Sequence, residues 1–112
     1  MFTLLAPLIY YSVFLDREVQ VPTGFSTDFA SIPRLLQNVI QVNGRHRSAA
    51  VIHDYLCSLV DIGSPGLTQG MADKVFREAM WCLDVEFVQS SIMYRMVRRY
   101  QKTKSWLLGE KY

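Results

Sequence analysis

The pattern of hydrophobic positions changes partway along the chain, from runs of strand-favouring residues to the period of helices. The segment LIYYSVF, which begins at Leu8, is rich in the aromatic and β-branched residues that strands favour. After the polar turn LDRE, the short run VQV ends at Pro22, whose nitrogen cannot donate a hydrogen bond to a neighbouring strand. Residues 8–21 are therefore predicted to form a β-hairpin.

A polar elbow, TGFSTDFAS, follows Pro22 and leads into sequence with helical spacing. Ser31 followed by Pro33 is typical of a helix start with Ser31 as the N-cap, and this short helix is predicted to end near Ile40. Three longer helices are predicted over residues 47–62, 69–83 and 87–106. The hairpin is thus expected to be followed by three to four helices.

The predicted helices carry apolar stripes that indicate one shared core. In the helix over 69–83, apolar residues recur with the period of one helix face, at Ala72, Val75, Phe76, Ala79, Met80 and Leu83. In the last helix, the residues expected to face the core are Ile92, Met93, Met96, Val97 and Tyr100. A hairpin followed by helices is an α+β arrangement, and 112 residues suffice for a single domain, 1–112, around one core.

Composition excludes some classes of protein. Every apolar run is shorter than the roughly 18 residues of a membrane helix. The N-terminal segment lacks the basic start and the cleavage site of a signal peptide. We therefore expect a cytoplasmic protein with no membrane partner, in which Cys57 and Cys82 are reduced thiols in the core.

The net charge of +2 hides a basic C-terminal segment. Six basic and nine acidic side chains precede Arg95, whereas residues 95–112 carry six basic side chains and one acidic side chain. The residues Arg95, Arg98, Arg99 and Lys102 recur with helical spacing. Such a stripe can contact the phosphates of a nucleic acid. An amphipathic helix needs a charged outer face in any case, and this second interpretation is favoured.

The apolar segment SAAVIHDYLCSLV contains a titratable pair, His53 and Asp54. His53 lies next to the core stripe of its predicted helix and is expected to be buried, whereas Asp54 lies about 100° further round. A buried histidine needs a hydrogen-bond partner. Asp28 in the elbow is expected to reach His53 or the backbone at the start of that helix, and Asp73 flanks the apolar stripe of the next helix. If the elbow folds over both helices, all four side chains converge.

This cluster has three interpretations, which the sequence leaves open. A purely structural network of buried polar groups is favoured over a bound cofactor. One histidine and several carboxylates are also compatible with Mg²⁺, Mn²⁺ or Zn²⁺, as in a metal-assisted hydrolase. The candidate metal ligands and catalytic residues are His53, Asp54, Asp73 and Asp28. The third interpretation is a binding site for another ligand, and its candidate contacts are Asp28, Ser31, Arg34, Arg45 and His53.

Three motifs, VPTGFSTDFASIPR, GRHRSAAVIHDYL and ADKVFREAM, occur in this order between Val19 and Met80. Together they resemble the phage and prophage family catalogued as domain of unknown function number 1353. The resemblance implies a small protein of tailed bacteriophages or integrated prophages, without implying an activity. It points to Asp28, Ser31, Pro33, Arg34, Gly44, Arg45, His53, Asp54, Tyr55, Ala72, Asp73 and Phe76. One departure is Cys57, which stands where the family pattern has a second aromatic residue.

The leading hypothesis is a phage-encoded protein of the host cytoplasm that binds a host factor or a small anionic ligand at a groove between the elbow and the helices. Arg34, Arg45 and Arg47 would supply contacts to an anion. The alternatives are a metal-assisted hydrolase and a component of the virion or of tail assembly. The sequence leaves the ligand and the oligomeric state open.

Overall fold

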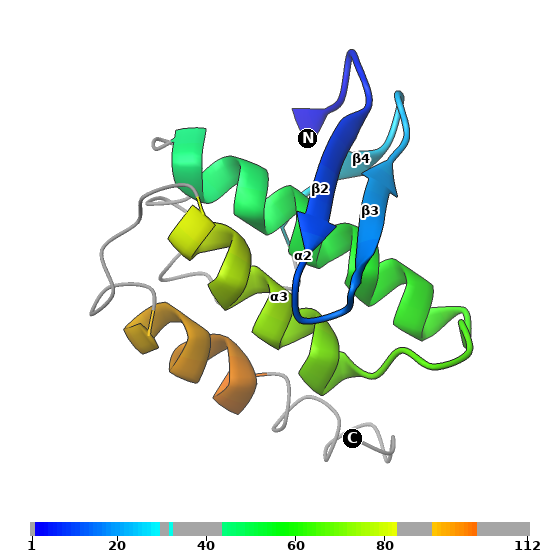
Figure 1. Cartoon of the computed structure of the whole chain (residues 1–112). Coiled ribbons are helices and arrows are strands. Elements are labelled where there is room, and N and C mark those ends of the chain that lie inside the picture. Colours follow the sequence, from blue (N-terminus) through cyan, green and yellow to red (C-terminus); the bar gives the residue numbers. More distant parts are fainter. Residues whose placement is uncertain (1, 30–31, 33–43, 83–90, 101–112) are drawn as a thin grey trace.

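The computed structural model describes residues 2–29, 32, 44–82 and 91–100 (Figure 1). Strands β2, Leu8–Ser12, and β3, Arg17–Val21, pair antiparallel, with Tyr10 opposite Val19. The amide of Leu15 donates to Ser12 Oγ at 3.1 Å inside the connecting turn. The predicted hairpin over residues 8–21 is therefore confirmed.

A second pair of strands fixes the start of the chain to the elbow. Strand β1, Phe2–Thr3, pairs antiparallel with β4, Ser26–Thr27. The Leu4 amide donates to the Phe25 carbonyl at 3.0 Å, which extends the pairing. These strands were not predicted, because two residues are too few to show an alternation of apolar and polar positions.

Two long helices follow the elbow. Helix α2, Gly44–Asp61, begins three residues before its predicted start, and Gly63 ends it in the left-handed region, at φ 79°. The amides of Gly63 and Ser64 donate to the carbonyls of Val60 and Leu59, at 3.0 and 2.9 Å, which is the Schellman arrangement. Helix α3, Gln69–Cys82, matches its prediction within one residue. Thr68 caps it by accepting a hydrogen bond from the Met71 amide at 3.2 Å.

Residues 91–100 are helical and lie inside the predicted last helix. Met93 and Val97 are buried as expected, but Ile92 and Tyr100 are exposed, so the prediction for these two was wrong. The buried stripe of this helix is narrower than its apolar content suggested. The short helix predicted from Ser31 to Ile40 lies outside the described residues apart from Ile32. Strands followed by helices confirm the α+β class.

The core lies between α2 and α3. Ile52 and Leu56 of α2 are buried, as are Val75, Phe76 and Ala79 of α3. The hairpin lies across this helix pair, and residues 91–100 run beside α3 (Figure 1). The helix pair is therefore covered by a hairpin and by a further helix.

Glu78 of α3 holds the hairpin in place. The Tyr10 hydroxyl donates to Glu78 Oε1 at 2.5 Å, and the Phe14 amide donates to Glu78 Oε2 at 2.8 Å. Burial, followed by the hydrogen bond to Glu78, raises the pKa of Tyr10 above its ordinary value, so the hydroxyl keeps its proton. One carboxylate therefore fixes both the strand and the turn of the hairpin.

The elbow contains a strained residue next to Asp28. Phe29 is buried and has φ 60°, a conformation that non-glycine residues rarely adopt. Its amide donates to Thr27 Oγ1 at 2.9 Å. The ring of Phe25 packs edge-on against the ring of Tyr55 on α2, with the two ring centroids 5.4 Å apart. The residues on both sides of Asp28 are thus anchored, and Asp28 itself is exposed.

Candidate functional site

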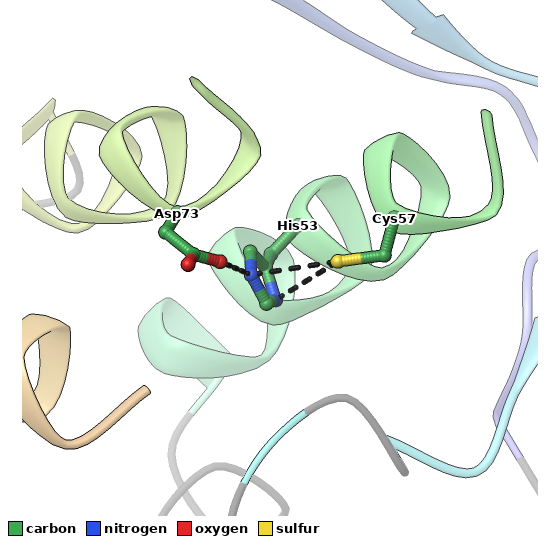
Figure 2. A group of neighbouring side chains, drawn as sticks. All are labelled: His53, Cys57 and Asp73. Atoms are coloured by element: carbon green, nitrogen blue, oxygen red, sulfur yellow. Dashed lines mark hydrogen bonds and ion pairs between the residues drawn. The ribbon is translucent and has the colours of Figure 1, made fainter. Parts of the chain in front are cut away.

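A charged pair joins α2 and α3 in the core. His53 Nε2 lies 2.6 Å from Asp73 Oδ1, and both side chains are fully buried (Figure 2). His53 lies beside the apolar stripe of α2, and Asp73 lies between the buried residues Ala72 and Val75 of α3. The pairing of His53 with Asp73 follows from the position of each residue on its helix.

Two further donors reach the same carboxylate. Gln69 Nε2 donates to Asp73 Oδ1 at 3.0 Å, and Arg98 Nη1 donates to Asp73 Oδ2 at 2.9 Å. Arg98 passes close to Gly70, where a Cβ atom would lie 3.2 Å from Nη1. Asp73 therefore receives hydrogen bonds from α2, from its own helix and from residues 91–100.

Cys57 completes the cluster. It lies one turn after His53 on α2, and its Sγ is 3.6 Å from Nε2 and 3.9 Å from Nδ1 of the imidazole (Figure 2). Gln69 Nε2 donates to this sulfur at 3.1 Å. We call His53, Cys57, Gln69, Asp73 and Arg98 the polar centre. Cys57 is buried as expected, but Cys82 is exposed, so the prediction of two core thiols was wrong for Cys82.

The hydrogen bonds fix the charges of the central pair. Burial alone would lower the pKa of His53, but the Cys57 side chain and the hydrogen bond to Asp73 raise it to about 10. Burial would raise the pKa of Asp73, but its bonds to His53, Gln69 and Arg98 lower it below its ordinary value. The pair is therefore an imidazolium and a carboxylate at neutral pH.

The other predicted site residues lie elsewhere or outside the described residues. Asp54 is half-buried beside His53, and Asp28 is exposed in the elbow. Within the described part of the chain, the metal-binding residue types whose donor atoms lie within 4.8 Å of one another are His53, Cys57 and Asp73. Asp54 and Asp28 do not belong to this group. The hydrogen bond predicted for Asp28 stays a prediction. Ser31, Arg34 and the Arg45 side chain lie outside the described residues.

Sequence reasoning missed three members of the polar centre. Cys57 was assigned to the core without a polar role, and Arg98 to a solvated stripe. Gln69 was considered only as a helix start. The signal that could have revealed Cys57 is its spacing of one helical turn from His53. The bond from Arg98 to Asp73 spans 25 residues and has no local signal.

The donors of the polar centre fit a metal ion in type but only partly in geometry. Nitrogen, sulfur and carboxylate oxygen together suit Zn²⁺. Ligand atoms about 2.1 Å from a tetrahedral ion lie about 3.4 Å from one another. The separation of 2.6 Å between His53 Nε2 and Asp73 Oδ1 is that of a short hydrogen bond and is less than two ligands of one ion would have. An ion would have to part these two atoms and to accept the nearby charge of Arg98.

Nucleophilic chemistry at Cys57 meets a different obstacle. A thiol, an imidazole and a carboxylate lie in contact, which are the parts that activate a sulfur nucleophile. Cys57 is only 6% exposed, and His53 and Asp73 are 0% exposed. A substrate cannot reach the sulfur without an opening of the helix pair. The arrangement therefore best serves to join three helical segments.

The outer face of β2 departs from the usual pattern of a surface hairpin. Ile9 and Tyr11 on β2 and Val13 in the turn that follows point outward, with exposed fractions of 58%, 54% and 75%. A hairpin with one face on the core normally alternates apolar and polar residues. We call these three residues the hairpin patch. The apolar signal at both odd and even positions of LIYYSVF could have revealed it from the sequence.

An acidic rim borders the hairpin patch. Across the hairpin, Tyr11 pairs with Glu18 and Ile9 pairs with Gln20, and both partners are exposed. The Tyr11 hydroxyl donates to Asp16 Oδ1 at 2.6 Å. The patch is therefore an apolar row with carboxylates on one side.

Comparisons with known proteins give one match. Residues 2–97 match the model of a family described as Protein of unknown function (DUF1353), which confirms the resemblance carried by the three motifs. No curated protein and no solved structure matches the chain significantly. In the described residues, every helix is too short or too polar to span a membrane.

Proposed function

We propose that this chain, which belongs to the DUF1353 family of proteins of unknown function, is a non-catalytic binding protein whose hairpin patch contacts a protein partner. The proposal includes a phage or prophage origin and action in the host cytoplasm, which rest on the motifs and on the sequence composition. The observation that carries it is the exposure of three successive outward side chains, Ile9 and Tyr11 on β2 and Val13 in the turn that follows it. Apolar surface of this kind, rimmed by polar residues, marks interaction sites.

The rest of the chain supports a binding role. The central pair of His53 and Asp73 is fully buried, so its hydrogen bonds are made within the protein. Glu78 fixes the hairpin at Tyr10 and at Phe14, so the patch is presented in one position before a partner arrives. A preordered surface loses less conformational entropy on binding. The partner expected from the acidic rim has an apolar centre and basic residues around it.

A selection from a library of random displayed peptides tests this proposal. Peptides that bind the wild-type protein should combine apolar and basic residues. They should lose binding to the double variant Ile9→Thr, Val13→Thr, which keeps β-branched side chains and removes apolar surface. Ile62→Thr is the matched control, since Ile62 is an exposed apolar residue outside the patch. Equal binding to the double variant, or selected peptides without this composition, would contradict the proposal.

A metal-assisted hydrolase is a second candidate, favoured by the approach of nitrogen, sulfur and oxygen donors within 4.8 Å. His53, Cys57 and Asp73 would hold the ion, which would activate water when bound. Thermal melting with and without Zn²⁺ or Mn²⁺ decides between the candidates. We expect the melting temperature to stay the same. A rise of several degrees in the wild type, and not in Asp73→Asn, would make the metal site the better proposal.

A further inference from the structure

The last described helix carries a surface with the chemistry expected of the partner. Ile92, Arg95, Met96 and Arg99 recur on one face of residues 91–100 and line a recess of about 170 Å³. Ile92 is 52% exposed, Met96 is half-buried, and both arginines are exposed. We call these four residues the helix face. It combines an apolar centre with two cations.

We propose that the partner of the hairpin patch is the helix face of a second copy of this chain. This inference rests on the proposed function and names the partner. In the contact, the apolar row of β2 covers Ile92 and Met96, and Glu18 lies near Arg95 or Arg99. The signs are complementary, because the rim of the patch is acidic and the helix face is basic.

The spacing of the apolar side chains also fits. Outward residues on a strand, such as Ile9 and Tyr11, repeat about every 6.8 Å. Ile92 and Met96 are four residues apart on a helix, which places them about 6 Å apart along its axis. Successive side chains of the strand can therefore pack against successive side chains of the helix without a change of register.

The two surfaces belong to different parts of the molecule. The hairpin contacts α3 through β2, whereas residues 91–100 are joined to α3 through Arg98 and through Arg77, whose guanidinium stacks on the Tyr94 ring at 4.6 Å (Figure 1). A patch that binds a different surface makes a heterologous contact. Each bound copy still presents one patch and one helix face. The assembly therefore continues head to tail until it closes into a ring or remains an open filament.

Charge reversal tests this contact by sedimentation velocity over a range of protein and salt concentrations. Wild type should form larger species as its concentration rises, and added salt should reduce them. Glu18→Arg alone and Arg95→Glu alone should each raise the dissociation constant by roughly tenfold or more, because like charges then meet. An equal mixture of the two variants should assemble again. Asp61→Arg, a reversal at an exposed residue outside both surfaces, is the control.

The double variant Glu18→Arg, Arg95→Glu separates this contact from a contact between two hairpins. It restores opposite charges in a head-to-tail contact and should assemble like wild type. A symmetric hairpin contact does not involve Arg95, so in that case the double variant should behave like Glu18→Arg alone, and Arg95→Glu alone should assemble like wild type. A monomeric double variant, or a wild type that is monomeric at every concentration, would overturn the inference. If wild type is monomeric at every concentration but selected peptides bind it and fail to bind the Ile9→Thr, Val13→Thr variant, the proposed function stands and the partner is a different protein.

Discussion

The polar centre and the hairpin patch are opposite departures from the usual distribution of residues. The polar centre places an imidazolium and a carboxylate in the interior and a half-buried arginine beside them, and each charge has a partner in the chain. The hairpin patch places apolar side chains on the surface, where water is their neighbour. A buried charge that is paired internally indicates a structural role, whereas exposed apolar surface indicates an external partner. In this protein, the titratable side chains of the polar centre, which could take part in chemistry, lie where a ligand has less access than at the hairpin patch.

Removal of the central carboxylate should have the largest effect on stability. Asp73→Ala leaves His53 and Arg98 without their shared anion, so we expect the free energy of unfolding to fall by about 3–5 kcal/mol. Urea unfolding followed by circular dichroism measures this change. The control is Asp61→Ala, at an exposed acidic residue, which should change stability by no more than about 0.5 kcal/mol. Equal effects of the two substitutions would mean that the polar centre does not hold the helices together.

Removal of the histidine should have a smaller effect. His53→Ala leaves Arg98 and Gln69 on Asp73, so the carboxylate keeps part of its hydrogen bonding. We expect a loss of about 1–3 kcal/mol, from a void beside Phe76 and from an incompletely paired carboxylate. The comparison is with Asp54→Ala at the neighbouring half-buried position. If Asp54→Ala proved the more destabilising of the two, the assignment of the structural role to His53 would fail.

Alkaline pH should weaken the same pair without a substitution. The pKa of His53 rises from 6.5 to about 10 in the folded chain, so its contribution to stability is complete below pH 6.5 and is lost as pH rises through about 10. The pKa of Asp73 is lowered, so its contribution is complete above pH 3.8 and is lost as pH falls through the folded-state value. A neutral ring can still donate a hydrogen bond to Asp73, so the alkaline loss is that of the charge interaction alone. Urea unfolding of wild type and of His53→Gln at pH values from 6.5 to about 10 measures this loss. If the free energies of unfolding of the two proteins differed by the same amount at every pH, the raised pKa of His53 would be contradicted.

Substitutions in the hairpin patch should have the smallest effect on stability. The double variant Ile9→Thr, Val13→Thr replaces exposed side chains and keeps the strand propensity, so we expect a change within about 0.5 kcal/mol. The same variant should lose peptide binding and assembly. A large destabilisation would show that the patch belongs to the folded core of the isolated chain, and the contrast between the two regions would disappear.

Local patterns predicted the elements well and the contacts between distant elements only in part. The hairpin follows from strand-favouring residues on both sides of the polar turn LDRE, and Gly63 marks the end of α2 because only a left-handed residue completes that cap. The burial of His53 follows from its place beside the apolar stripe of its helix, whereas the sequence pointed to Asp28 as its partner and to Asp73 only as one member of a possible cluster. Arg98 could not be assigned in this way, since a basic residue beside an apolar stripe can point to solvent or to a buried carboxylate with the same spacing. Ile92 shows the converse, an apolar residue next to the buried Met93 that lies at the surface.

The convergence of three helical segments on Asp73 also governs how parts of the protein open. The bonds from His53 and Arg98 span 20 and 25 residues, so neither residue can leave without separating elements that are distant in the chain. Detachment of residues 91–100 would expose the second oxygen of a buried carboxylate and weaken the contact between α2 and α3 at the same moment. The three segments therefore form one cooperative unit of local unfolding. Their backbone amides should exchange with solvent deuterium together, and more slowly than those of the two-residue strands at the start of the chain.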